Sequence, residues 1–322
     1  MRLTMLFLSS ILLLASCQQQ GYDRQSLIAL GTVCTIQLPA GTRPQVYDQV
    51  QKALDTVDGE LSRTKASSQI AILNREKQAT LSDDVLALLQ EGIEVAEKTD
   101  GAFDPAIGAL TGMWAIATDH PRVPSEEEIQ SVDTDWKHIR IVGDQVTIPA
   151  TMEIDLGAIG KGYAADRIKE VLRENRVSSA LVNLGGNIYA IGEKQGGNPW
   201  VIGLRDPNGD EGQAFITIQV RDLSLVTSGA YERNFTQDGV TYHHILDRKS
   251  GYPAESDLAS ASILGPSSTL CDALSTSVFV LGSEKGMDLV ESLAGYACVL
   301  VKKDGAILFS RDFPYPYQLR SI

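Results

Sequence analysis

The second half of the chain is patterned for antiparallel β-sheet. Between residues 214 and 220, apolar side chains recur at every second position, which is the period of a strand with one buried face. Residues 258–264 alternate in the same way, and paired apolar runs predict hairpins over 139–148 and 297–310. We expect the buried set of the first strand to be Ala214, Ile216, Ile218 and Val220, opposite Phe215, Thr217 and Gln219.

Amphipathic helices are interspersed with these strands. Apolar residues recur at helical spacing over 44–61, 82–98, 162–175 and 268–281. Residues 28–38 are patterned as a strand, and 153–156 as the end of another. Helices and strands do not follow the steady alternation of a parallel sheet. We therefore predict an α+β fold over residues 27–322, a single domain with mixed, largely antiparallel sheets and packed helices.

Helix ends are also marked in the sequence. Ser82 precedes the second helix as a cap, and Ser125 with Glu128 forms a capping box that opens a short acidic helix. Gly282 ends the last long helix, and Ser283 caps a further one.

The N-terminus is patterned as a targeting segment. Arg2 is followed by an apolar run over residues 3–14, and Leu14-Ala-Ser-Cys17 matches a bacterial lipobox. We expect residues 1–16 to be a lipoprotein signal peptide, Cys17 to carry lipid, and residues 17–26 to be a polar tether. An ordinary secretory signal with an incidental Cys17 is the alternative. The lipobox predicts a protein of the bacterial periplasm, anchored by lipid to the inner or the outer membrane.

The net charge of the chain limits the kinds of partner that it can bind. The formal charge of −13 argues against binding to nucleic acid or to an anionic membrane surface, so we expect membrane contact through the lipid only. A bound polyphosphate would need a metal or a nearby lysine to offset repulsion. The cysteines other than Cys17 are Cys34, Cys271 and Cys298, too widely spaced for a disulfide framework or a zinc site.

The segment from Asp155 to Asp166 concentrates an acid, several glycines and Lys161 between the expected strand end and helix. Glycine lets backbone N–H groups approach an anion closely, so the segment could bind phosphate. It is not a P-loop, because Gly162 follows the lysine where Ser or Thr is required. A plain strand-to-helix turn is the alternative.

A second set of polar residues lies on the helix at 268–281. Asp272 and Thr276 are one helical turn apart and project from the same face. A carboxylate and a hydroxyl are hard oxygen ligands that suit Mg²⁺, which completes its shell with water and substrate phosphates. A threonine bonded to its own helix is the alternative. Residues 227–233 and 243–251 add hydroxyls, Arg233 and the pair His243 and His244.

Together these segments resemble the ApbE family, the FAD:protein FMN transferases. The resemblance covers nearly the whole chain after the tether. Its motifs, in order, are Leu30-Gly-Thr32, Gly101-Ala-Phe-Asp-Pro105, Asp155-Leu-Gly-Ala-Ile-Gly-Lys-Gly-Tyr-Ala-Ala-Asp166, Val182-Asn-Leu-Gly-Gly186, Thr227-Ser-Gly229, His244-Ile-Leu-Asp247 with Ser250-Gly251, and Asp272-Ala-Leu-Ser-Thr276.

The resemblance implies an ApbE-like (T-fold-like) domain with one FAD site and Mg²⁺ at the pyrophosphate. The residues that would contact FAD are Leu30, Ala102, Phe103, Asp104, Asp155, Lys161 and Leu246. The metal would be held by the backbone carbonyl of Ala158 and the side chains of Asp272 and Thr276. His244 is our candidate for the base that activates the acceptor hydroxyl.

The activity implied is transfer of FMN from FAD to a Thr or Ser hydroxyl of an acceptor protein, with release of AMP. The acceptors would be extracytoplasmic flavoproteins such as redox-pump subunits. Thr64 falls where relatives carry a tyrosine that stacks on the flavin, and Asn187 where many carry an aspartate. Looser binding at Thr64 would favour an alternative, a Mg²⁺-dependent FAD pyrophosphatase. A non-catalytic FAD-binding lipoprotein is a third possibility.

Overall fold

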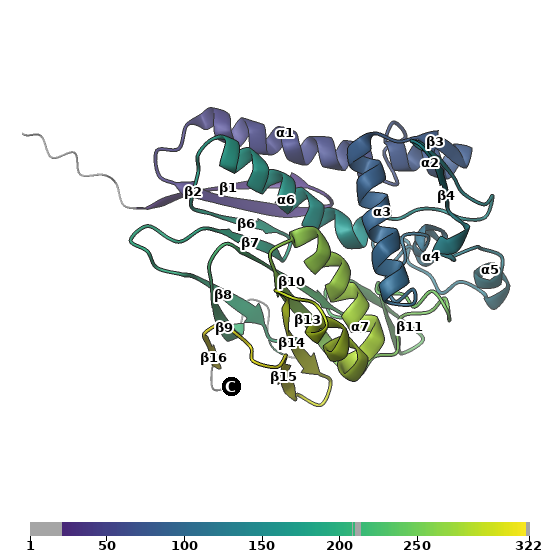
Figure 1. Ribbon diagram of the computed structural model, residues 1–322. Coiled ribbons are helices and arrows are strands. Elements are labelled where there is room, and N and C mark those ends of the chain that lie inside the picture. Colours follow the sequence, from purple (N-terminus) through teal and green to yellow (C-terminus); the bar gives the residue numbers. More distant parts are fainter. Residues whose placement is uncertain (1–20, 208, 210–213, 320–322) are drawn as a thin grey trace, which may run out of the picture.

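The computed structural model describes residues 21–207, 209 and 214–319. An eight-stranded sheet, in the order β1-β2-β6-β7-β10-β13-β14-β15, forms its centre, with each strand antiparallel to its neighbours (Figure 1). The strands are β1 Tyr22–Ala29, β2 Thr32–Pro39, β6 Ala180–Leu184, β7 Asn187–Ile191, β10 Leu223–Gly229, β13 Leu258–Gly265, β14 Ala297–Lys302 and β15 Ile307–Phe309. The predicted α+β class is confirmed.

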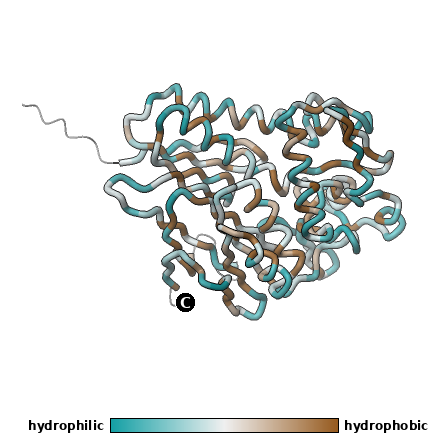
Figure 2. The backbone as a smooth tube through the Cα atoms, viewed as in Figure 1, coloured by the Kyte–Doolittle hydropathy of each residue, from teal (hydrophilic) through white to brown (hydrophobic). Residues whose placement is uncertain are grey.

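Three long helices, α1 (Pro44–Leu61), α6 (Gly157–Glu174) and α7 (Ser268–Glu291), cover one face of this sheet (Figure 1). The apolar stripe of α1 and that of α6 bury against alternate residues of β2, β6 and β7. The stripe of α7 packs in the same way on β10, β13 and β14. Figure 2 shows hydrophobic residues concentrated where these helices and strands meet, and hydrophilic residues along the outer loops.

A smaller sheet covers part of the opposite face. It has the order β16-β9-β8, formed by Tyr317–Leu319, Ala214–Val220 and Trp200–Arg205. Its inward residues form a separate core with β7, β10, β13 and β14. Ile216, Ile218 and Val220 are buried as the alternation predicts, and Phe215 is buried as well.

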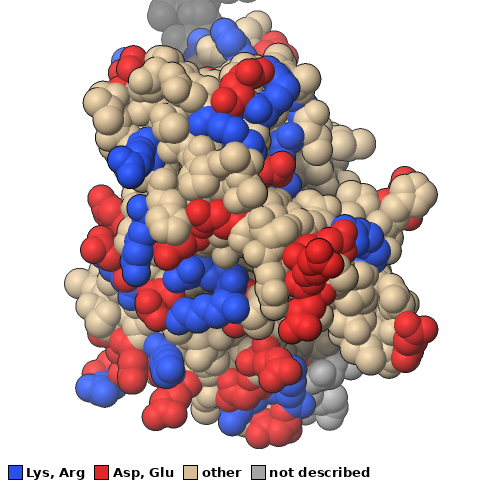
Figure 3. Space-filling view, turned by 90° about the vertical axis from the view of Figure 1, so that its right-hand side faces the viewer, with Lys and Arg blue, Asp and Glu red and all other residues tan. Residues whose placement is uncertain are grey.

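The remaining elements form a lobe at the right of Figure 1. Its elements are α2 Gln69–Glu76, β3 Gln78–Thr80, α3 Asp83–Lys98, α4 Gly108–Trp114, α5 Glu126–Gln130, the 3₁₀ turn Trp136–His138, β4 Arg140–Val142 and β5 Gln145–Thr147. The hairpin of β11 (Asn234–Gln237) and β12 (Val240–His243) packs on the lobe through Phe235 and Tyr242, which lie beside Trp114. Figure 3 shows acidic and basic side chains interspersed over this face.

Several predicted elements differ in detail. The strand expected over 28–38 is a hairpin, β1 and β2, with Leu30 and Gly31 at positive φ in its turn. Strand β1 begins at Tyr22, so the last residues of the expected 17–26 tether belong to the sheet. The capping box at Ser125 and the break at Gly282 are confirmed. At Ser82 the hydroxyl accepts from Gln69 rather than capping α3.

The largest difference concerns the segment 155–166. Residues 153–156 form no strand; Glu153 makes one isolated bridge with Ile107. Helix α6 begins at Gly157, five residues before the expected start, so Lys161 lies inside the helix. The N-terminal signal and Cys17 lie outside the described residues. Among the helices that are described, none has the length and apolarity needed to cross a bilayer.

Candidate active site

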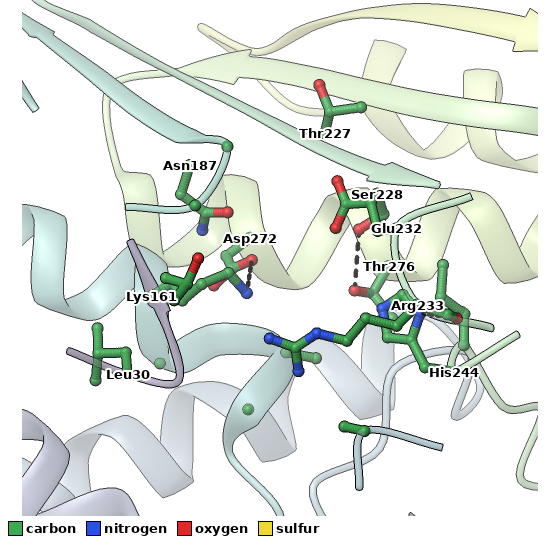
Figure 4. Close-up of a pocket in the computed structure, with 18 of the residues that line it drawn as sticks. Leu30, Lys161, Asn187, Thr227, Ser228, Glu232, Arg233, His244, Asp272 and Thr276 are labelled. Atoms are coloured by element: carbon green, nitrogen blue, oxygen red, sulfur yellow. Dashed lines mark hydrogen bonds and ion pairs between the residues drawn. The ribbon is translucent and has the colours of Figure 1, made fainter. Parts of the chain in front are cut away.

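A cavity of about 790 Å³ opens between the eight-stranded sheet and the lobe (Figure 4). Every residue predicted to bind FAD or metal, and the predicted base, lies in its wall, although they come from distant parts of the chain. They are Leu30, Ala102, Phe103, Asp104, Asp155, Ala158, Lys161, His244, Leu246, Asp272 and Thr276. The lipidation residue Cys17 lies outside the part of the chain that the structure describes.

The crossing of α6 and α7 fixes one wall. A Cβ at Gly162 would lie 2.2 Å from the Ser268 carbonyl oxygen, so only glycine permits this approach. The Gly162 N–H donates to Asp272 Oδ2 at 2.9 Å. In a regular helix that N–H would donate to the carbonyl of Ala158, four residues earlier. Because this N–H donates to Asp272, the hydrogen bond that it would make to the Ala158 carbonyl within the helix is weakened.

The start of α7 is held by an acid of α6. Asp166 Oδ2 accepts from the N–H and hydroxyl of Thr269 at 2.8 and 2.7 Å, and Oδ1 accepts from the Ser268 N–H at 3.1 Å. A carboxylate at a helix N-terminus satisfies free N–H groups and interacts favourably with the helix dipole. Asp166 therefore fixes α7, and with it Asp272, relative to α6.

Oxygen atoms and a cation meet at this crossing. The oxygens belong to Asp272 and Thr276, and the cation is Lys161. Asp272 is 3% exposed, and its Oδ1 lies 3.9 Å from Lys161 Nζ. Thr276 is one turn further along α7, with its Oγ1 3.4 Å from Ser228 Oγ. Figure 4 shows Lys161 next to Asp272, and Thr276 next to Ser228.

Asp155 is oriented by an arginine that the sequence reasoning missed. Arg63 Nη1 donates to Asp155 Oδ2 at 3.1 Å, and its Nη2 donates to Glu153 Oε2 and to the Gly108 carbonyl. The other oxygen of Asp155 accepts from the Gly157 N–H at 2.8 Å. Arg63 and the two acids lie about ninety residues apart in sequence, and an arginine beside the expected flavin-contact loop was the only available signal.

Asp104 sits in a tightly packed corner of the cavity. Its Oδ1 accepts from the Ala106 N–H, and Arg248 Nε lies 3.3 Å from its Oδ2. A Cβ at Gly101 would lie 2.0 Å from Arg248 Nε, so glycine makes room for the guanidinium. Burial raises the pKa of the Asp104 carboxyl to about 7, while the Ala106 N–H and Arg248 oppose that rise.

The hairpin turn of β1 and β2 brings Leu30 to the cavity. Leu30 has φ 53°, in the left-handed region that a leucine seldom occupies. Gly31 follows at φ 68°, which completes a two-residue turn of the type that matches strand twist. Backbone strain of this kind persists where the surrounding structure enforces it, often at ligand sites.

His244 and two charged residues, Glu232 and Arg233, also line the cavity (Figure 4). The His244 Nδ1 lies 3.2 Å from the Arg233 carbonyl, which can only accept, so Nδ1 carries the proton and Nε2 is left as an acceptor. Burial lowers the pKa of His244 to about 4, which keeps the imidazole neutral. Burial raises the pKa of Glu232, opposed by Lys161 and Arg233. Sequence reasoning gave Glu232 no role.

Comparisons with known proteins agree with this arrangement. The sequence profile of the ApbE family matches residues 30–300. The FAD:protein FMN transferase of Treponema pallidum (strain Nichols) is 37% identical over 88% of this chain and 85% of its own length. The chain belongs to the ApbE family.

Other ApbE proteins support the assignment. The FAD:protein FMN transferase of Klebsiella pneumoniae (strain 342) is 35% identical over 78% of this chain and 80% of its own. The crystal structure of the ApbE protein from Thermotoga maritima superposes with a TM-score of 0.83 at 33% identity, covering 91% of this chain and 98% of that one. Thus both sequence and fold place the chain in the ApbE family.

The donors at the helix crossing fit a hard divalent cation. Among the described residues there is no cluster of three or more His, Cys, Asp or Glu side chains suited to a metal. The ligand set expected from the resemblance has only one carboxylate, and a carbonyl and a hydroxyl would supply the other oxygens. Ala158, Asp272 and Thr276 line the same cavity, and the Gly162 N–H is turned to Asp272. This all-oxygen set matches the preference of Mg²⁺.

Thr64 contributes no aromatic ring to the cavity, as expected of a threonine at this position. Thr64 is exposed and is absent from the cavity wall, whereas Ser62 and Arg63 of the same loop line it. Looser binding of FAD for lack of a stacking ring at position 64 stays a prediction. Aromatic rings at the cavity wall come instead from Phe103, Trp114 and Tyr231.

Proposed function

We propose that the protein is a Mg²⁺-dependent FAD:protein FMN transferase. The observation that carries this proposal is one cavity that unites Lys161, the oxygen donors of Ala158, Asp272 and Thr276, and every residue expected to contact FAD. Relatives that share up to 37% identity over most of the chain are FAD:protein FMN transferases. The substrates are FAD and a protein that offers a Thr or Ser hydroxyl.

The reaction is displacement at the FMN phosphorus. The hydroxyl oxygen of the acceptor forms a P–O bond, the P–O bond to the AMP moiety breaks, and AMP leaves with the electron pair. Mg²⁺, when bound, offsets charge on the diphosphate oxygens. Negative charge builds on the leaving phosphate during the reaction, and the positive charge of the Lys161 ammonium stabilises it.

His244 supports the incoming hydroxyl. Its Nδ1–H is committed to the Arg233 carbonyl, so Nε2 is free to accept the hydrogen bond of the acceptor hydroxyl. We assign to His244 the role of base that receives this proton. Because its pKa is about 4, the ring is unprotonated and ready to accept at neutral pH.

Transfer is favoured over the alternatives. The case for a pyrophosphatase rests on Thr64 loosening the flavin, whereas relatives that are 37% and 35% identical to this chain are FAD:protein FMN transferases. A storage protein would leave Lys161, Asp272 and Thr276 without a chemical task at the crossing of α6 and α7. Transfer uses all three.

The cellular setting follows from the N-terminal sequence. We propose that Cys17 carries lipid and holds the enzyme at a membrane of the bacterial periplasm, where it meets extracytoplasmic acceptors such as redox-pump subunits. The net charge of −13 supports contact with the membrane through the lipid rather than through the protein surface.

One assay tests the activity. The full-length chain in detergent is incubated with FAD, Mg²⁺ and the extracytoplasmic domain of a redox-pump subunit, followed by a denaturing gel and measurement of AMP. We expect flavin fluorescence in the acceptor band with one AMP per flavin attached. AMP and free FMN without a labelled band would show that the protein hydrolyses FAD rather than transferring FMN. FAD recovered intact would refute both activities.

A pair of acidic positions on α7 supplies the control. Asp272→Ala is expected to abolish labelling with the fold retained, because it removes the buried carboxylate of the cavity. Asp288→Ala removes an exposed acid of the same element outside the cavity and should leave labelling intact. Equal activity in the two variants would remove the metal assignment.

A further inference from the structure

Asn187 carries an unpartnered hydrogen-bond donor in the cavity wall. It is the first residue of β7, and it is 2% exposed. Its Nδ2 has no hydrogen-bond partner within the part of the chain that the structure describes. Buried amide donors in native proteins are nearly always satisfied, so such a group at a cavity calls for a ligand acceptor.

The backbone that leads into Asn187 is fixed by its neighbours. Strands β6 and β7 are joined by the two-residue turn Gly185-Gly186, and Leu184 pairs directly with Asn187. The Gly186 N–H donates to Asn183 Oδ1 at 2.9 Å. A Cβ at Gly185 would lie 2.3 Å from Thr32 Oγ1, which locks the turn against β2.

The neighbours of Asn187 define the chemistry of its ligand. Figure 4 shows its carboxamide directed to the side of the cavity that holds Lys161 and Asp272. Lys161 Nζ is 3.9 Å from Asp272 Oδ1, beyond hydrogen-bond distance, so the ammonium keeps donors for a ligand. The Nδ2 group and the ammonium can donate but cannot accept. Two donors, one of them cationic, suit an anion.

We propose that Asn187 Nδ2 donates to a non-bridging oxygen of the FAD diphosphate, alongside Lys161. This inference rests on the proposed function, because it assigns a contact to the same substrate. Asn187 is then a binding residue for the diphosphate rather than for the flavin or the adenine. Its place near the metal donors means that the bond is made next to the P–O bond that breaks.

The test compares a ligand that has the diphosphate with one that lacks it. Binding of FAD and of riboflavin is measured by fluorescence, with EDTA present to prevent turnover, for wild type, Asn187→Ala and Asn187→Asp. We expect FAD to bind about tenfold more weakly or worse in both variants, since each loses a hydrogen bond to a charged group. Riboflavin should bind to all three within about twofold, because it offers no diphosphate oxygen.

Two controls keep the inference falsifiable. Asn198→Ala changes an exposed asparagine in the loop before β8 and should alter neither affinity. Melting curves check the fold; should the alanine variant unfold, the isosteric aspartate variant decides. Unchanged FAD affinity, or an equal loss for riboflavin, would overturn the assignment.

The outcome is separable from that of the proposed function. Absence of acceptor labelling by the wild type would refute the transfer activity and leave the Asn187 contact standing, because the binding measurement needs no turnover. A normal labelling assay together with unaltered FAD binding in both Asn187 variants would do the reverse.

Discussion

His244 is neutral because of where the chain places it. Its ring is enclosed by the cavity wall and beside the cations Arg233 and Lys161, and its pKa falls from 6.5 to about 4. The backbone carbonyl of Arg233 holds its Nδ1 proton, which opposes but does not cancel the effect of burial. Burial and the nearby cations therefore make the ring sensitive to acid, while the Arg233 carbonyl leaves Nε2 as the acceptor.

The consequence is a pH-dependent stability. The unfolded chain takes up the His244 proton near pH 6.5 and the folded chain only near pH 4, so folding is weakened as pH falls through that window. We expect a loss of about 1–2 kcal/mol from this residue, allowing for solvent screening of a partly exposed ring. Denaturant melts of wild type and His244→Gln between pH 7 and 4.5 measure it.

The control for this measurement is His120→Gln, which removes an exposed histidine from the lobe. The His244 variant should lose less stability on acidification than wild type, and the His120 variant should follow wild type. Parallel pH curves for all three proteins would show that His244 is not buried as a neutral ring.

At the scale of elements, the crossing of α6 and α7 sets the geometry of the site. Gly162 permits the contact and Asp166 binds the first turn of α7, so both helices are held as one unit. We predict that Gly162→Ala destabilises the protein by more than about 2 kcal/mol, because its Cβ would overlap the Ser268 carbonyl and force the helices apart. Chemical denaturation gives the difference.

A glycine two residues away provides the matched control. A Cβ at Gly160 would meet only Leu61 Cδ1, at 3.5 Å, which is an ordinary contact. Gly160→Ala should therefore be neutral or stabilising by about 0.5–1 kcal/mol, from helix propensity and a stiffer unfolded chain. If both substitutions destabilise equally, the crossing is not the reason for glycine at 162.

Asp166 can be tested through the position of α7. Asp166→Asn keeps the shape but removes the charge that faces the helix N-terminus and weakens bonds to Ser268 and Thr269. We expect a loss of about 1–3 kcal/mol in stability. Asp272 lies about one helical turn after Ser268 and Thr269, so a displaced α7 would also displace Asp272. The Mg²⁺ concentration needed for half-maximal activity should therefore rise. A stability loss with no change in Mg²⁺ requirement would confine Asp166 to a structural role.

The elements differ in how far sequence could predict them. Helix α1 spans the residues expected, because its apolar stripe is continuous and no residue within it breaks the period. The turn at Leu30 was missed because a leucine gives no signal for positive φ. The early start of α6 was missed because Gly157 and Gly160 suggest a loop, whereas here the helix tolerates them.

The residues of the site also differ in how far the sequence could predict them. Motifs that carry their chemistry locally, such as Asp272 with Thr276 one turn later, could be read from spacing. Arg63 and Asn187 could not, because their significance depends on partners brought near by the fold. Arg63 meets Asp155 across 92 positions, and only the fold reveals that the Asn187 amide lacks a partner.

At the scale of the whole molecule, the lipobox predicts where the enzyme resides. Replacing Cys17 by serine removes the thiol that would receive lipid, so the protein should move from the membrane fraction to the soluble fraction of the cell envelope. Gln19→Ala, a change in the adjoining polar segment, should stay with the membrane. Detection of the Cys17→Ser variant in washed membranes at the wild-type level would contradict lipid anchoring.

The net charge predicts that binding of FAD and binding of the proposed Mg²⁺ depend on each other. FAD brings an anionic diphosphate to a chain of formal charge −13, and the cations of the cavity wall, such as Lys161 and Arg233, lie among acids such as Glu232 and Asp272. Each ligand should therefore bind better when the other is present, by a coupling of about 1–3 kcal/mol. We expect FAD and Mg²⁺ together to raise the melting temperature by more than the sum of their separate shifts, since ligands of the folded state stabilise it by mass action.

In Asp272→Ala this excess should vanish, and in Asp288→Ala it should persist. An FAD shift that is the same with Mg²⁺ and with EDTA would mean that the diphosphate is bound without a metal.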